Sequence, residues 1–212
     1  MVKLAEKSDS GVQPGPPADP YCTLPAVVFL DEKLSILDAR LAKLTQHASK
    51  IDGLTAPQRA SLELIPASSS LAKSIRHLIK AGYLLSALVL FRPLMERVAT
   101  LSYLIENADA VSLWEAGWPH GQRPSLRARL ETLIPGAGEA FLSGTAAAVT
   151  KYNSFVHGDP AAVQQSLIQV SDSRIVYTSD KDYSTPGRAN SIALETAIAV
   201  VFLVVKTDQL FP

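Results

Sequence analysis

Apolar residues recur at helical spacing along most of the chain, and this pattern predicts an all-α fold. From residue 30 to residue 48 the spacings alternate between four and three, so the apolar side chains form one stripe of a helix and charged residues take its outer face. The members of the stripe are Leu30, Leu34, Leu37, Leu41, Leu44 and Ala48. Asp52 and Gly53 are expected to close this helix.

Start and stop signals divide the following residues into several helices. Thr55 is a suitable N-cap for a helix with Pro57 in its first turn, and residues 68–83 are expected to form another helix. Residues 108–117 predict a shorter amphipathic helix, and a further helix begins at Pro124 or Ser125. The inward-facing residues expected for the helix over 68–83 are Leu71, Ile75, Leu78 and Ile79.

Two segments are apolar on more than one face. Residues 84–107 carry a long stripe at four-three spacing and are apolar elsewhere, which predicts a central helix that Pro93 kinks or begins. The stripe consists of Leu84, Leu88, Phe91, Met95, Val98, Ser102 and Ile105. Residues 191–208 predict a closing helix, and its longest apolar run is shorter than the roughly 20 residues that span a bilayer. It is expected to be a core helix with no membrane partner.

The segment between these helices contains another helix and a polar stretch. Residues 139–157 predict a helix that Gly158 ends, and Asp159 with Pro160 suits the start of a helix over residues 161–170. Residues 171–190 are polar, and "RIVYT" is their one signal of regular structure, which suits a short strand or hairpin. The prediction is an all-α helical bundle with a long polar loop, containing at most a small hairpin, before the last helix.

Composition sets the domain boundaries. Residues 1–22 are rich in proline and glycine and predict a disordered tail, while residues 23–212 are expected to form a single helical-bundle domain. The 20 Lys and Arg residues balance the 20 Asp and Glu residues, which disfavours an extended track for duplex nucleic acid. One cysteine, Cys22, excludes an internal disulfide and suits a reducing, cytoplasmic location. No motif for a metal or a nucleotide cofactor is present.

Arg92 and Glu96 stand out because they lie in the most apolar helix. They are four positions apart and share one face, and ions in such surroundings are expected to have partners. One interpretation is structural, with the two pairing with each other or with a neighbouring helix. The other is that they support a polar pocket in which Arg92 binds an anion or a phosphate group.

The stretch "KYNSFVHGDP" supplies the second group of candidates. His157 lies at a helix end, where an imidazolium is favoured by the helix dipole, and Asn153 and Ser154 share its side of the helix. Histidine transfers protons near neutral pH, and Lys151 is close enough in sequence to stabilise negative charge. A structural role as a helix-end residue stands beside this catalytic one.

"KYNSFVHG" together with "LFRPLMERVATLSYLIE" resembles the HEPN superfamily of helical bundles, in particular prokaryotic branches with an Arg-Pro-x-x-Glu helix and a late histidine. Many members are metal-independent ribonucleases of toxin–antitoxin, antiphage or RNA-processing systems that act as homodimers, and others only bind. The resemblance implies a catalytic His157 with Asn153 as the intervening polar residue. Lys151 stands roughly where the family has arginine, which is a departure because lysine lacks the planar fork, and Arg92 is a candidate substitute.

The resulting hypothesis is a cytoplasmic, metal-independent endoribonuclease or RNA-binding protein of a bacterial defence or toxin system, with a cognate partner protein. Its catalytic residues are His157, Lys151 and Asn153, and its substrate-binding residues are Arg92, Glu96 and Ser154. The alternative is a non-catalytic helical module that binds a partner protein or a ligand.

Two further basic segments have simpler interpretations. "SIRHLIK", with Arg76 and His77, is expected to be a solvated basic face of a helix. "WEAGWPHGQRPSLRAR" gathers aromatic and basic residues that suit RNA bases and phosphates. A packed corner with exposed arginines is the preferred interpretation of this second segment.

Overall fold

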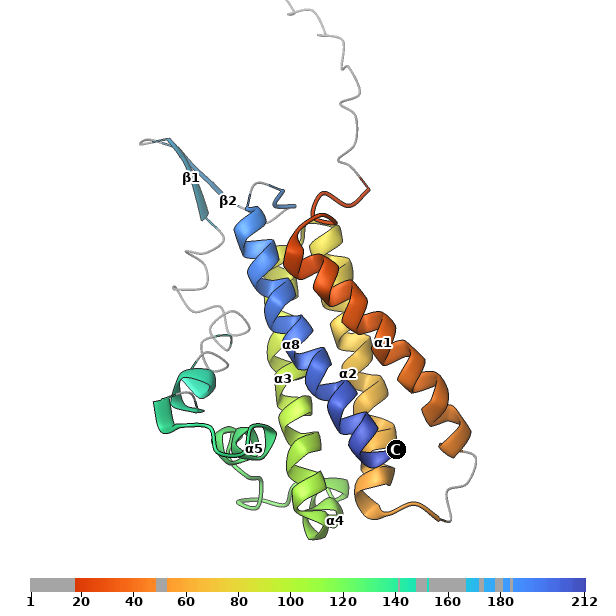
Figure 1. The fold of residues 1–212 in the computed structure, drawn as a ribbon. Coiled ribbons are helices and arrows are strands. Elements are labelled where there is room, and N and C mark those ends of the chain that lie inside the picture. Colours follow the sequence, from red (N-terminus) through yellow and green to blue (C-terminus); the bar gives the residue numbers. More distant parts are fainter. Residues whose placement is uncertain are drawn as a thin grey trace, which may run out of the picture.

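The computed structural model describes residues 18–48, 53–140, 142–147, 152, 167–171, 174–177, 181–183 and 185–212. Four long helices form the bundle: α1 (Pro25–Ala48), α2 (Ala56–Lys80), α3 (Leu84–Glu106) and α8 (Pro186–Leu210). They lie side by side in Figure 1, with α1 packed mainly on α8 and α2 mainly on α3. The all-α helical bundle predicted from the sequence is confirmed.

Shorter elements lie outside the four long helices. A 3₁₀ turn, η2 (Ala108–Ala110), leads into α4 (Val111–Glu115), and α5 (Leu126–Leu133) packs on α3. Strands β1 (Leu167–Ser171) and β2 (Arg174–Tyr177) pair antiparallel, with Leu167 opposite Tyr177. Residues 139–140 and 142–147 are helical, as is Tyr152.

The core consists of the predicted apolar stripes. On α1, Leu30 and Leu37 are fully buried and Leu34 and Leu44 nearly so, while Leu41 is half-buried. On α3 the whole predicted stripe is buried except Ile105, which is half-buried, and the helix continues through Pro93. Burial of this kind stabilises a fold by roughly 1.5–3 kcal/mol for each large apolar side chain.

Local capping explains where α2 and α5 begin. The hydroxyl of Thr55 accepts from the backbone N–H of Gln58, whose side chain accepts from the N–H of Thr55, so the two form a reciprocal capping box. The side chain of Ser125 accepts from the N–H of Ala128 in the same way at α5. Both helix starts predicted from the sequence are confirmed.

Three boundaries differ from the prediction. The two helices expected between Thr55 and Tyr83 are one helix, because Pro66 is accommodated inside α2. Residues 167–170, expected to end a helix, are part of β1, where pairing with β2 satisfies the backbone. The closing helix begins at Pro186, five residues before the expected Ser191, because proline suits a first helical position.

Helix α8 lies at the centre of the packing and contacts α1, α2 and α3. It is long and apolar enough to cross a membrane by length and composition alone, and about half of its most apolar stretch is buried inside the bundle. Ala193, Ala197 and Val200 are fully buried. The small side chains allow close approach of the neighbouring helices, as a core helix requires.

The first described residues, 18–22, belong to the segment that the sequence predicts to be a disordered tail. Tyr21 is buried, and its hydroxyl donates a hydrogen bond of 2.6 Å to the backbone carbonyl of Asp182. Arg76 on α2 binds Asp19 and Asp31, each at 2.6 Å. The segment before α1 is therefore attached to α2 and to the segment before α8, and Arg76 belongs to an ion-pair network instead of a solvated basic face.

Candidate functional site

Arg92 and Glu96 form an ion pair on α3, with Nη2 of Arg92 3.0 Å from Oε1 of Glu96. The second carboxylate oxygen of Glu96 lies 3.4 Å from Nη2 of Arg123, which precedes α5. All three side chains are partly exposed, at 28%, 24% and 55%. One carboxylate therefore binds two guanidinium groups, and the predicted pairing within α3 and with a neighbouring segment is present.

Arg129 on α5 is a third guanidinium beside the same glutamate. The residue is only 3% exposed, and its Nη1 donates to the hydroxyl of Thr100 at 2.8 Å and to the backbone carbonyl of Glu96 at 3.3 Å. Its Nε is buried and has no hydrogen-bond partner in the part of the chain that the structure describes. The expected corner of exposed arginines is wrong for this residue, because α5 packs Arg129 onto α3.

The charges around Arg129 favour the binding of an anion. Burial lowers the pKa of Arg129, the positive charge of Arg123 acts in the same direction, and Glu96 opposes both. We call Arg92, Arg123 and Arg129 the arginine cluster. It contributes three positive charges against the single negative charge of Glu96, so a bound phosphate or carboxylate would relieve the repulsion.

Another arginine on α5 has a different environment. Arg127 is exposed and binds two carboxylates, those of Glu139 and of Glu131, the latter at 3.3 Å. Its charge is therefore already compensated. Arg127 is a natural control for the arginine cluster, because it lies on the same short helix and differs in the number of acidic partners.

A cavity of about 440 Å³ lies between α3, α5 and α8, with Gly144, Thr145 and Tyr152 as further lining residues. Its walls are mainly apolar and include aromatic rings from two helices and from Tyr152. The lining residues are Phe91, Met95, Leu130, Leu133, Ile134, Gly144, Thr145, Tyr152, Glu195, Ile198 and Phe202. Arg92 and Glu96 are not among them, so the charged face and the cavity face of α3 are separate.

Tyr152 and Glu195 form the polar end of this cavity. The Tyr152 hydroxyl donates a hydrogen bond of 2.6 Å to Oε2 of Glu195, and its ring meets the ring of Phe91 edge to face at 5.3 Å. Burial raises the pKa of Tyr152 above its usual range, and the hydrogen bond and negative charge of Glu195 add to this. The phenol therefore remains a hydrogen-bond donor at neutral pH.

Sequence reasoning missed the role of Glu195. The residue interrupts the most apolar stretch of the chain. A carboxylate in such a helix rarely lacks a partner, and this is the sequence signal that could have indicated its role. Its partner was not predictable from local sequence, since Tyr152 lies 43 positions earlier.

The structure describes two of the six candidate residues. Arg92 and Glu96 are brought together, whereas Lys151, Asn153, Ser154 and His157 lie outside the described residues. Tyr152, within the same motif, contacts Phe91, which is the residue before Arg92. This contact lies on the cavity face of α3, beside the face that carries Arg92 and Glu96.

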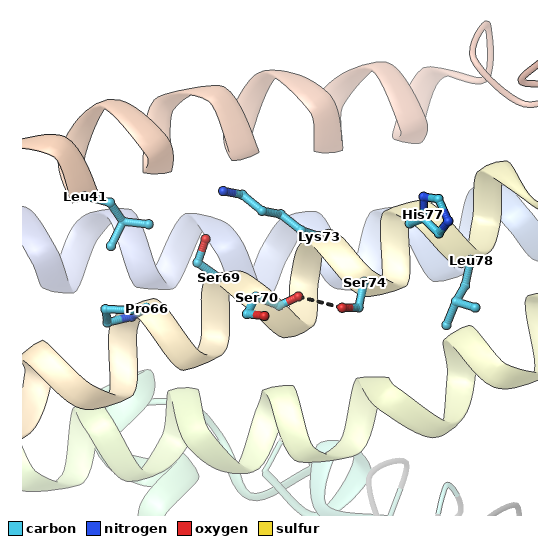
Figure 2. A pocket seen from close by; sticks show the side chains of 8 residues that line it. All are labelled: Leu41, Pro66, Ser69, Ser70, Lys73, Ser74, His77 and Leu78. Carbon is cyan, nitrogen blue, oxygen red and sulfur yellow. Dashed lines mark hydrogen bonds between the residues drawn. The ribbon is translucent and has the colours of Figure 1, made fainter.

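An open groove of about 710 Å³ lies between α1 and α2. Figure 2 shows Lys73 reaching from α2 toward α1, with Leu41 opposite and His77 farther along. The ammonium group of Lys73 lies 2.5 Å from Asp38, and both side chains are about half exposed. The charge of Lys73 is therefore already paired, and solvent screens this groove.

Comparison with known proteins gives no match: no protein-family model, no curated protein and no solved structure is significantly similar to the chain.

Proposed function

We propose that the protein acts on RNA and that the arginine cluster binds its phosphate groups. The observation that carries this proposal is the grouping of three guanidinium groups at Glu96. Arg92 and Arg123 bind its carboxylate, and the buried Arg129 donates to its backbone carbonyl and has no carboxylate partner among the described residues. Arginine binds phosphate through paired N–H donors, and a local excess of positive charge attracts a polyanion even where the whole chain is neutral. A compact cluster suits one or two phosphates of a single strand better than a long duplex track.

The HEPN resemblance supplies the chemistry of the proposal. His157 takes the proton from a ribose 2′-hydroxyl, whose oxygen attacks the neighbouring phosphorus, or it protonates the departing 5′ oxygen. Lys151 and Arg92 stabilise the charge that develops on the phosphate oxygens. Asn153 and Ser154 orient the histidine or the phosphate, and Glu96 holds Arg92 in position, so the reaction uses no metal.

A contact between Tyr152 and α3 links the two motifs of the resemblance, and a shared site requires His157 to reach the neighbouring face of α3 that carries Arg92. Tyr152, five residues before His157, contacts Phe91, one residue before Arg92, on the face of α3 that lines the cavity. The proposed biological setting is a bacterial toxin or antiphage system in the cytoplasm with a cognate partner protein.

Cleavage of mixed single-stranded RNA in the presence of a chelator tests the catalytic part of the proposal. The wild-type protein is expected to cleave, and His157→Ala to lose about 100-fold or more in rate, because general acid–base catalysis contributes on that order. Equal cleavage by both proteins would remove His157 from the mechanism. Absence of cleavage by the wild type would leave RNA binding as the activity to be measured.

A homodimer is the proposed assembly, and exposed apolar residues on α8 favour it. Leu194, Ile198 and Val205 are 45%, 45% and 54% exposed, and their spacings of four and seven place them on one face. Exposed apolar residues that share one helix face favour an interaction surface. The same face suits the alternative function, a non-catalytic module that binds a partner protein.

A further inference from the structure

We infer that the cavity between α3, α5 and α8 is a binding site for a small organic cation with an apolar body, such as a lipophilic amine. This inference does not depend on RNA binding, because the arginine cluster does not line the cavity. The volume of about 440 Å³ lies within the range of roughly 300–1,000 Å³ that is typical of small-molecule sites.

The charge of the ligand follows from the charged lining residue. Among the described residues that line the cavity, Glu195 is the one acidic side chain, and no lysine or arginine accompanies it. Tyr152 donates to Oε2, whereas Oε1 accepts no hydrogen bond from the described part of the chain. A carboxylate in an apolar setting favours a cationic partner that also donates hydrogen bonds, and an ammonium group does both.

The apolar body of the ligand follows from the walls. Phe91, Phe202 and the ring of Tyr152 supply π faces, and Met95 with Ile198 adds adaptable apolar surface. Aromatic faces attract ammonium groups as well as rings, so the walls and the carboxylate favour the same class of molecule. An anionic ligand would instead meet the negative charge of Glu195 in a setting where water screens it poorly.

Tyr152 also fixes the geometry of the acceptor. Its hydroxyl holds Glu195 from one side, and its ring is held in turn against Phe91 at 5.3 Å. The carboxylate is therefore positioned before a ligand arrives, and less conformational entropy is lost on binding.

Calorimetric titration with three molecules that share one apolar body tests the inference. The probes are diphenylpropylamine, diphenylpropanol and diphenylpropanoate, which end in a cation, a neutral hydroxyl and an anion. The full chain is expected to bind the amine at least about tenfold more tightly than the alcohol, a factor that corresponds to roughly 1.4 kcal/mol. Binding of the propanoate is expected to be weaker still.

Glu195→Gln removes the negative charge of the site and keeps the shape of the side chain. The amide oxygen can still accept from Tyr152, so the fold is retained, and the preference for the amine over the alcohol is expected to disappear. Glu63→Gln, which changes an exposed carboxylate on α2 away from the cavity, is the matched control and is expected to keep the preference. Equal affinity of the wild type for all three probes, no binding of the amine, or an unchanged preference in Glu195→Gln would overturn the inference.

Ile198→Trp provides a second variant that tests the location. The added ring occupies part of the cavity from an exposed position on α8, so it is expected to weaken binding of the amine and the alcohol alike. Unchanged affinity for both in this variant, with native helix content by circular dichroism, would place the binding elsewhere and overturn the inference.

Discussion

Individual side chains far apart in the sequence connect the loop segments to the bundle. Tyr21 bonds to the carbonyl of Asp182, 161 positions away, and Tyr183 donates to the carbonyl of Ala81 at 3.0 Å. Asp182 in turn donates its N–H to the carbonyl of Gly82 at 2.8 Å. These contacts join the start of the described chain, the α2–α3 turn and the segment before α8.

The first prediction at this scale concerns the ionisation of Tyr21. Burial, helped by the negative charge of Asp182 and by Tyr183, raises the pKa of Tyr21 from 10.0 to about 12. The folded state therefore retains a proton that the unfolded chain releases above pH 10, and the associated stability is present below pH 10 and is lost as the pH rises toward 12. In Tyr21→Phe this contribution is absent.

Chemical denaturation of both proteins at intervals between those pH values measures this difference. The free energy of unfolding of the wild type is expected to fall by roughly 1–2 kcal/mol more than that of Tyr21→Phe. The other tyrosines titrate in both proteins and cancel. Parallel pH curves for the two proteins would contradict a buried, protonated Tyr21.

At the scale of the element, the turn between α2 and α3 depends on one glycine. Gly82 has φ of +82°, and a Cβ added there would lie 2.7 Å from the ring of Tyr183. Gly117 has a similar φ of +77°, but no atom lies within 4 Å of its added Cβ. The two positions therefore share the backbone strain and differ in the steric conflict.

Alanine substitution at both positions separates these effects. Gly117→Ala is expected to lower the free energy of unfolding by about 1 kcal/mol, the usual cost of the left-handed conformation for a residue with a Cβ. Gly82→Ala is expected to cost clearly more, because the Tyr183 ring and its hydrogen bond to Ala81 are displaced as well. Thermal unfolding of both variants measures the two losses of unfolding free energy. Equal losses would show that the Tyr183 ring moves aside without a cost in stability.

The elements were predictable from the sequence where local signals decide them. The four-three stripes of α1 and α3 and the caps at Thr55 and Ser125 depend on residues a few positions apart, and each is confirmed. The strand at 167–170 was missed because its stability comes from pairing with Arg174–Tyr177 instead of from its own pattern. The division of residues 55–83 into two helices was wrong, because α2 continues through Pro66.

The candidate site was predictable to a smaller degree. Arg92 and Glu96 were identified because charged residues in an apolar helix need partners, and their pairing follows from the helical spacing. Arg129 and Glu195 acquire their roles through tertiary contacts with α3 and with Tyr152. No local pattern encodes contacts across 33 or 43 positions.

For the whole molecule, the exposed face of α8 bears on the oligomeric state. Leu194→Lys with Val205→Lys places two charges on this face without touching the lining of the cavity. Sedimentation velocity at micromolar concentration is expected to show a dimer for the wild type and a monomer for the double variant. A wild-type monomer would exclude a site shared between two subunits.

The affinity of the protein for RNA tests the proposal that the arginine cluster binds phosphate groups. Fluorescence anisotropy with a labelled single-stranded RNA is measured in chelator and in a His157→Ala background, so that the RNA remains intact. Arg92→Ala and Arg123→Ala are each expected to weaken binding about fivefold to thirtyfold, roughly 1–2 kcal/mol, and to reduce the salt dependence by about 0.7 in the logarithmic slope. Arg127→Ala, whose arginine already has two acidic partners, is expected to bind as the parent does. Equal affinities for all four proteins, or no binding by the parent, would contradict the claim.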